Sequence, residues 1–156
     1  MKGKKMRTAA MVALITMATF LWAFGTTPVQ AAEEIRIGFL APMTGPLAKP
    51  GEDLTNGFKL FWDQHGLKAG GRPVKIFYAD SMCNPDNTMA QARRLIHADK
   101  VDYIMGGLCG HVGPALAQVS RETGVPMLII PGADELTKWD LVTTVIRTSG
   151  AASQIG

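Results

Sequence analysis

Two cysteines and a histidine are the residues of this chain whose types and spacing suit chemistry. Cys109 and His111 stand two positions apart inside the glycine-spaced segment Gly107–Gly113, and Cys83 precedes them. A thiol and an imidazole so close together suggest a nucleophile with its general base. If the protein is exported, an even number of cysteines favours a disulfide instead. The disulfide is the favoured prediction, because an exported thiol would have to escape oxidation and nothing in the sequence orients the imidazole.

The glycine-spaced segment itself predicts a loop that enters a helix, where backbone amides can bind a phosphate or a carboxylate. No Gly-x-Gly-x-x-Gly follows the first predicted strand and no Gly-Lys-Ser/Thr occurs, so a nucleotide site is not indicated. The three histidines lie on different elements, which argues against a metal site. Asp134 and Glu135 are adjacent in a loop, where successive side chains diverge. We therefore expect no metal, no cofactor and no catalytic constellation, and favour a binding protein over an enzyme.

Apolar runs alternate with amphipathic segments along most of the chain. Asn84 followed by Pro85 is a helix-start signal, Gly124 marks a helix end, and the glycines and prolines of 66–73 predict a turn. The predicted strands are 35–40, 74–79, 101–105, 126–130 and 141–147, and the predicted helices are 52–65, 85–99 and 110–123, with a further helix starting near 152. Four residues form the predicted apolar face of the first helix: Leu54, Phe58, Phe61 and Trp62.

Strands that alternate with helices predict an α/β fold with a parallel sheet and helices on both faces. Ligands of such sheets bind beyond the carboxyl ends of the strands, at the switch in strand order. We call this edge the rim and expect it to be formed by segments 42–51, 80–84, 106–111 and 131–135. If the second and third strands flank the first, the two cysteines lie together on the rim and a disulfide would fix two of its loops.

The first 31 residues have the pattern of a secretory signal peptide. A basic start is followed by an apolar run and by small residues at Val29 and Ala31, which predicts cleavage after Ala31. A membrane anchor is the alternative, but Gly25 and Pro28 interrupt the run too early for a spanning helix. Four of the 16 Lys and Arg residues belong to this segment, which leaves 12 basic and 13 acidic residues and a net charge of −1 in residues 32–156. We therefore expect no nucleic-acid partner.

Five segments resemble one known family in their order and spacing. They are Ile37–Pro46, Gly51–Gly57, Asp80–Pro85, Gly106–Cys109 and Pro131–Ala133. Together they resemble the periplasmic solute-binding proteins of ABC importers, in the leucine/isoleucine/valine-binding branch. The resemblance implies the type I periplasmic-binding-protein fold, with two α/β lobes joined by a hinge. Residues 32–156 would then be an incomplete first lobe, with the second lobe absent. The branch can carry a disulfide at the positions of the two cysteines.

The resemblance also implies which residues contact the ligand. These are Leu108, Cys109, Gly110, His111, Gly132, Ala133 and Asp134, with Lys49, Pro50 and Gly51 forming a wall. Amino-acid binders of this family usually have a hydroxyl residue in place of Gly110, a threonine near Asp134 and often an aromatic residue near Pro50. A carboxylate at Asp134 would repel the carboxylate of a ligand or pair with its ammonium group, an effect of several kcal/mol at about 4 Å. We therefore expect a ligand other than leucine, isoleucine or valine.

The function implied by the resemblance is the capture of a small amino acid or a related organic ligand in the periplasm. The partner would be the ABC permease of the inner membrane. A ligand-sensing receptor lobe of the same fold is the alternative. Since ligands of this family are enclosed by two lobes, we expect residues 32–156 alone to bind weakly and to expose an apolar edge of the sheet.

Overall fold

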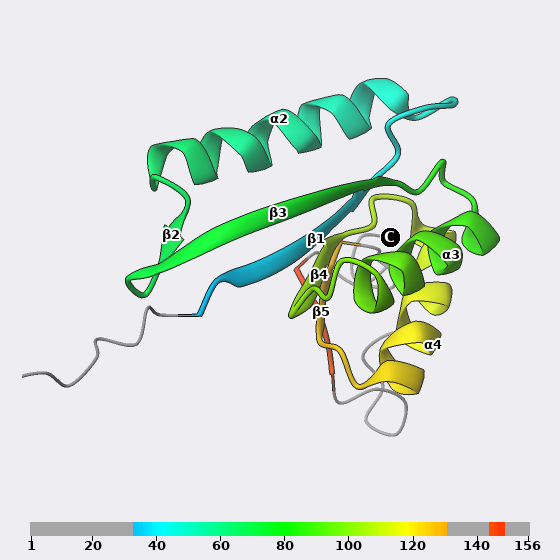
Figure 1. Cartoon of the computed structure of the whole chain (residues 1–156). Coiled ribbons are helices and arrows are strands. Elements are labelled where there is room, and N and C mark those ends of the chain that lie inside the picture. Colours follow the sequence, from blue (N-terminus) through cyan, green and yellow to red (C-terminus); the bar gives the residue numbers. More distant parts are fainter. Residues whose placement is uncertain (1–32, 131–143, 149–156) are drawn as a thin grey trace, which may run out of the picture. The chain divides into compact units, whose positions relative to one another are not determined.

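A computed structural model describes residues 33–130 and 144–148 (Figure 1). The elements within these ranges are β1 (Ile35–Ala41), α2 (Ala48–Gln64), β2 (Lys68–Ala69), β3 (Arg72–Asp80), α3 (Pro85–His97), β4 (Tyr103–Gly106), α4 (Gly113–Thr123), β5 (Met127–Ile129) and β6 (Val145–Arg147). A 3-10 turn, Gly110–Val112, precedes α4. The described strands form one sheet in the order β2-β3-β1-β4-β5-β6.

The second and third predicted strands flank the first, which is the condition for a rim shared by the two cysteines. β1 pairs in parallel with β3 on one side and with β4 on the other. The chain therefore leaves β1 in one direction and later crosses back over it to reach β4. In such sheets a crevice opens between the carboxyl ends of the two strands at the reversal, here β1 and β4.

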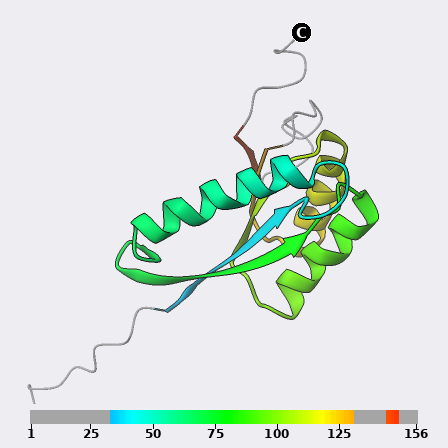
Figure 2. The same ribbon diagram turned by 90° about the horizontal axis from the view of Figure 1, so that it is seen from above.

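Helices cover both faces of the sheet, as predicted (Figures 1 and 2). On one face, α3 and α4 pack against Leu40, Ile104 and Ile129 in the larger apolar cluster. Gly38 lets α3 approach closely, since a Cβ there would lie 3.1 Å from Leu95 Cδ1. On the other face, Trp62 of α2 packs against Ile37 and Val74.

The sequence signals for helix ends are confirmed. The side chain of Asn84 accepts a hydrogen bond from Asn87 N at 2.9 Å, and Pro85 is the first residue of α3. Gly124 adopts a left-handed φ of 71° after α4, and its amide donates to Ser120 O at 2.8 Å. These caps satisfy backbone groups that a helix end otherwise leaves unpaired.

The first helix differs from its prediction. It begins at Ala48 and not at Glu52, so Pro50 lies in its first turn. Its buried residues are Gly51, Thr55 and Trp62, whereas Phe61 is 50% exposed. The extra turn is closely packed, since a Cβ on Gly51 would lie 1.8 Å from Pro42 O.

The sheet also differs from a purely parallel one. The predicted turn over 66–73 contains β2, which pairs antiparallel with the start of β3. Gly70 and Gly71 connect the two strands with φ of 56° and 79°, the left-handed values that a two-residue hairpin turn needs. The third and fourth predicted strands are present but shorter, and residues 145–147 of the fifth form a strand. Of the fifth, residues 141–143 lie outside the described ranges, as does the helix predicted near 152.

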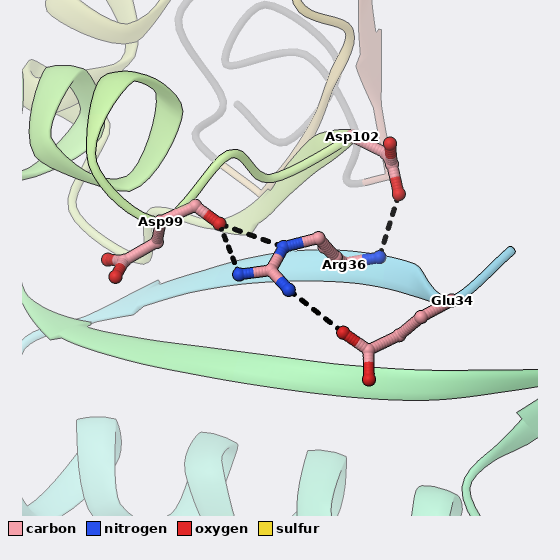
Figure 3. A network of polar contacts seen from close by, with 4 residues as sticks. All are labelled: Glu34, Arg36, Asp99 and Asp102. Carbon is pink, nitrogen blue, oxygen red and sulfur yellow. Dashed lines mark hydrogen bonds and ion pairs between the residues drawn. The ribbon is translucent and has the colours of Figure 1, made fainter.

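A polar network fastens the amino end of β1, opposite the rim (Figure 3). The guanidinium of Arg36 donates twice to the carbonyl oxygen of Asp99, at 2.9 and 2.7 Å, and pairs with Glu34 at 2.9 Å. The carboxylate of Asp102 accepts from Arg36 N at 2.7 Å. The guanidinium carbon also lies 4.5 Å from the centre of the Phe77 ring. These contacts join β1 to the segment that leads from α3 into β4.

No helix among the described residues is long and apolar enough to cross a membrane. The predicted signal peptide, residues 1–31, lies outside the described ranges, so its cleavage stays a prediction.

Candidate functional site

The rim brings together the loops that follow β1, β3 and β4. Cys83 and Cys109 form a disulfide with their Cα atoms 5.6 Å apart, which confirms the favoured prediction. The bond joins the loop after β3 to the loop after β4, on either side of β1. Since neither sulfur is a thiol, Cys109 is not a nucleophile.

His111 supports the same junction. Its Nε2 lies 2.5 Å from the carbonyl oxygen of Cys83, and because a carbonyl can only accept, Nε2–H is the donor. The side chain is exposed. His111, which lies in the 3-10 turn, thus holds the loop after β3 through this hydrogen bond.

Gly106, where β4 ends and the next loop starts, is tightly packed between β1 and the end of β5. Gly106 has a φ of 113°, and a Cβ on it would lie 2.0 Å from Leu40 O, so only glycine fits there. The amide of Gly107 donates to Leu40 O at 2.8 Å, and Ile130 N donates to Gly106 O at 3.0 Å. These bonds place the start of this loop beside the ends of both β1 and β5.

The predicted contact residues of this loop differ in accessibility. Cys109 is buried, Leu108 is half-buried, and Gly110 is exposed with open space around the position of a Cβ. The first backbone hydrogen bond of the 3-10 turn runs from Val112 N to Cys109 O at 3.1 Å. The amides of Gly110 and His111 precede that bond, which is the position where the start of a helix can bind an anion.

The remaining predicted site residues are only partly covered by the structure. Lys49 and Pro50 are exposed at the start of α2, and Gly51 is buried. Lys49 forms ion pairs with Glu52 at 3.2 Å and with Asp53 at 3.0 Å. Gly132, Ala133 and Asp134 lie outside the described residues, so their place on the rim stays a prediction. β5, which leads into them, ends beside β4.

Asp80, the last residue of β3, is a rim residue that the sequence did not single out as functional. Its carboxylate accepts hydrogen bonds from Met43 N at 2.8 Å, from Thr44 Oγ1 at 2.5 Å and from Met82 N at 2.9 Å. Burial raises the pKa of Asp80, but the hydrogen bonds from Thr44, Met82 and Met43 outweigh it, so that the pKa lies below its ordinary value. A carboxylate directly after the predicted strand 74–79 was the available signal, but Thr44, one of its hydrogen-bond partners, is 36 residues away.

Among the hollows on the face of the sheet that carries α2, two reach over β4 and β5. One, of about 420 Å³, is near the rim, with Gly106, Ile130 and Thr148 from the strand ends and Phe39, Phe58 and Asp53 in its lining. The other, of about 480 Å³, lies farther from the rim on the same face. It is bounded by Phe61 and Trp62 of α2 and by Leu128 and Ile146 of the sheet. Both are mainly apolar, so the described part of the chain leaves apolar sheet surface open beside α2.

No group of three potential metal ligands occurs within residues 33–130 and 144–148. Among the described rim residues, the groups that can meet a polar ligand include backbone amides, the hydroxyl of Thr44, the imidazole of His111 and the carboxylate of Asp80, which is already hydrogen-bonded. Such groups suit the recognition of a polar ligand.

Comparison with known proteins gives this arrangement a family. Residues 34–156 match the family described as periplasmic binding protein. The Leu/Ile/Val-binding protein BraC3 of Rhizobium johnstonii is 31% identical over 141 residues, which are 88% of this chain and 37% of that protein.

Solved structures agree in fold. A solute-binding protein of an ABC transporter from R. palustris, in complex with 4-hydroxybenzoate, is 30% identical with a TM-score of 0.69, over 76% of this chain and 32% of that one. Another from R. palustris, in complex with benzoate, is 31% identical with a TM-score of 0.72, over 79% and 34%. This chain spans about a third of the length of these relatives. With the family match over residues 34–156 and the shared fold, the chain belongs to the type I periplasmic binding proteins.

Proposed function

We propose that this chain is the ligand-binding part of an extracytoplasmic solute-binding protein that serves an ABC importer. Its partners would be a small organic ligand and the permease in the inner membrane, and it would work in the periplasm without a cofactor and without catalysis. The observation that carries the proposal is the rim, where three loops are held together at the switch point of a family fold used for binding.

The ligand class that suits the rim best is a small carboxylate. The amides of Gly110 and His111 stand at the start of a 3-10 turn that continues into α4, where partial positive charge favours an anion. Gly110 supplies an amide but no hydroxyl, and the space around it is open. A ligand carboxylate would thus be bound there by the backbone alone.

Two kinds of carboxylate compete for this role. The relatives with about 30% identity include a Leu/Ile/Val-binding protein and proteins in complex with benzoate and 4-hydroxybenzoate. An α-amino acid also carries an ammonium group, which needs an acceptor. We propose that the ligand is not simply leucine, isoleucine or valine, since the hydroxyl residue usual in amino-acid binders is replaced by Gly110. An aromatic acid is then the first alternative to test.

Calorimetric titration of the full protein with leucine, isoleucine, valine, benzoate and 4-hydroxybenzoate tests this choice. We expect micromolar or tighter binding of an aromatic acid and no sub-micromolar binding of the three amino acids. Tight binding of leucine would overturn the proposed ligand class. Failure of every carboxylate in the panel to bind would argue against the rim as a carboxylate site.

Substitution of Gly110 gives a sharper test with a matched control. Gly110→Ser places a hydroxyl on the rim without a clash, while Gly110→Ala adds the Cβ alone. A hydrogen bond to a charged group contributes about 1.5–3 kcal/mol. Gly110→Ser should therefore strengthen carboxylate binding about tenfold over Gly110→Ala. Equal affinities of the two variants would show that the ligand does not reach this turn.

A further inference from the structure

The loop between β1 and α2, residues 42–47, is attached to the rest of the rim mainly through one carboxylate. Asp80 Oδ1 accepts from Met43 N at 2.8 Å, and Oδ2 accepts from Thr44 Oγ1 at 2.5 Å. Both oxygens of one side chain are thus engaged by a segment more than 35 residues away in sequence. Such charge-assisted bonds are among the stronger hydrogen bonds in proteins.

Asp80 is itself held firmly by the start of α3. Its carbonyl oxygen accepts from Asn87 Nδ2 at 2.8 Å, and the next residue, Ser81, donates its amide to Ala41 O at 2.9 Å. Ser81 O in turn accepts from the buried hydroxyl of Thr88 at 3.3 Å. The backbone of Asp80 is therefore fixed by these hydrogen bonds. Its carboxylate can in turn position the loop after β1.

The same carboxylate also shapes the turn that carries the disulfide. Oδ1 accepts from Met82 N at 2.9 Å, and Met82 and Cys83 both have left-handed φ values, 51° and 50°. Residues other than glycine adopt this conformation at a cost of about 1–2 kcal/mol each. Surrounding contacts must maintain two such residues in sequence, and strained turns of this kind cluster at functional sites.

The loop after β1 in turn sets the start of α2. A Cβ on Gly51 would lie only 1.8 Å from Pro42 O, so the loop and the first turn of the helix are in tight contact. Lys49 and Pro50 belong to this turn. A shift of Met43 and Thr44 would therefore be transmitted to the wall of the site.

From this arrangement we infer that Asp80 is a positioning residue for ligand binding, which fixes the loop after β1 and the start of α2 relative to the disulfide-bonded loops. The inference rests on the proposed function. Asp80 need not contact the ligand in this role. Thr44, which is exposed, is the residue of the loop whose side chain is bonded to Asp80.

Thr44 supplies a gentle test. Thr44→Val keeps the shape of the side chain and removes the hydroxyl, while Thr44→Ser keeps the hydroxyl. In titrations of the full protein with 4-hydroxybenzoate and with leucine, we expect Thr44→Val and Asp80→Asn to bind the better of these probes about tenfold more weakly. Thr44→Ser should stay within about twofold of the original protein. Unchanged affinity in both Thr44→Val and Asp80→Asn would overturn the inference.

Arg36→Met is the control for a purely structural effect. Arg36 fastens the amino end of β1, opposite the rim, so its loss should lower the melting temperature and leave the affinity unchanged. If Arg36→Met weakened binding as much as Asp80→Asn does, the effect of Asp80 would be one of global stability and the inference would fail.

Amide hydrogen exchange separates this inference from the proposed function. In the absence of ligand, Met43 N should be protected in the original protein and in Thr44→Ser, and it should exchange at least tenfold faster in Asp80→Ala, which removes the acceptor of its hydrogen bond. If neither probe binds the original protein, the ligand class is wrong, while the exchange result still decides whether Asp80 positions the loop. Equal protection of Met43 N in Asp80→Ala and in the original protein would contradict the inference.

Discussion

Removal of the Cys83–Cys109 disulfide should cost this domain a large share of its stability. The bond spans a sequence separation of 26 residues. In the chain-entropy model, closing a loop of that size disfavours the unfolded state by about 3.5 kcal/mol. Domains of this size are stable by roughly 5–15 kcal/mol, so the loss would be a quarter of the total or more.

Two measurements separate the cross-link from the packing of the sulfur atoms. Reduction of the original protein with dithiothreitol removes the cross-link alone. The double variant Cys83→Ala, Cys109→Ala also removes the sulfur at Cys109, which is only 4% exposed. Its loss should add about 1 kcal/mol through the small cavity that remains. Alanine is preferred to serine, because a hydroxyl buried at this position would need a hydrogen-bond partner.

Urea unfolding followed by circular dichroism provides the assay. A loss of about 3.5 kcal/mol should lower the midpoint by about 2 M, and the slope should rise because the unfolded chain expands once the bond is gone. A loss below about 1 kcal/mol on reduction, with an unchanged slope, would refute the reasoning. The rim would then be held by its hydrogen bonds, with the disulfide as an addition.

Three further predictions concern single side chains. Gly51→Ala should destabilise the fold by about 2–3 kcal/mol in urea unfolding, since its Cβ would collide with Pro42 O, whereas the control Gly57→Ala, in open space on the same helix, should stabilise it by about 0.5–1 kcal/mol. Arg36→Met should cost about 1–2 kcal/mol and Arg36→Lys nearly as much, because lysine cannot donate twice to Asp99 O in the same plane; no loss in either variant would contradict the role given to the network. Burial raises the pKa of Asp80 but its hydrogen bonds lower it further, so the folded chain should lose stability as the pH falls below the ordinary value of 3.8, and an unchanged acid transition in Asp80→Asn would be evidence against this.

Local signals in the sequence were sufficient for much of the fold. The continuous apolar run 126–130 predicted a central strand because both faces of a parallel sheet are covered. Asn84–Pro85 and Gly124 predicted helix ends because each satisfies a fixed backbone requirement. The disulfide followed from the cysteine count and the predicted strand ends, and the structure confirms it.

The features missed by the sequence depend on contacts between distant segments. The helix was predicted to begin only at Glu52, after Lys49-Pro50-Gly51, yet proline is tolerated in a first turn and Gly51 is needed for the approach to Pro42. The hairpin at Gly70-Gly71 had a local signal, two adjacent glycines between short extended segments, that we read only as a turn. The role of Asp80 had none that was specific, because it lies in a bond to Thr44 made by the fold.

The rim contacts share a thermodynamic role in the proposed function. Any residue that a ligand had to order on binding would cost about 1–2 kcal/mol, so a flexible rim would lose most of the affinity that a small ligand can provide. The disulfide, His111 and Asp80 order the rim during folding, before a ligand binds. The packing of the core then offsets both the entropy lost in ordering the rim and the strain at Met82 and Cys83. It follows that reduction of the disulfide should weaken ligand binding even under conditions where the protein remains folded.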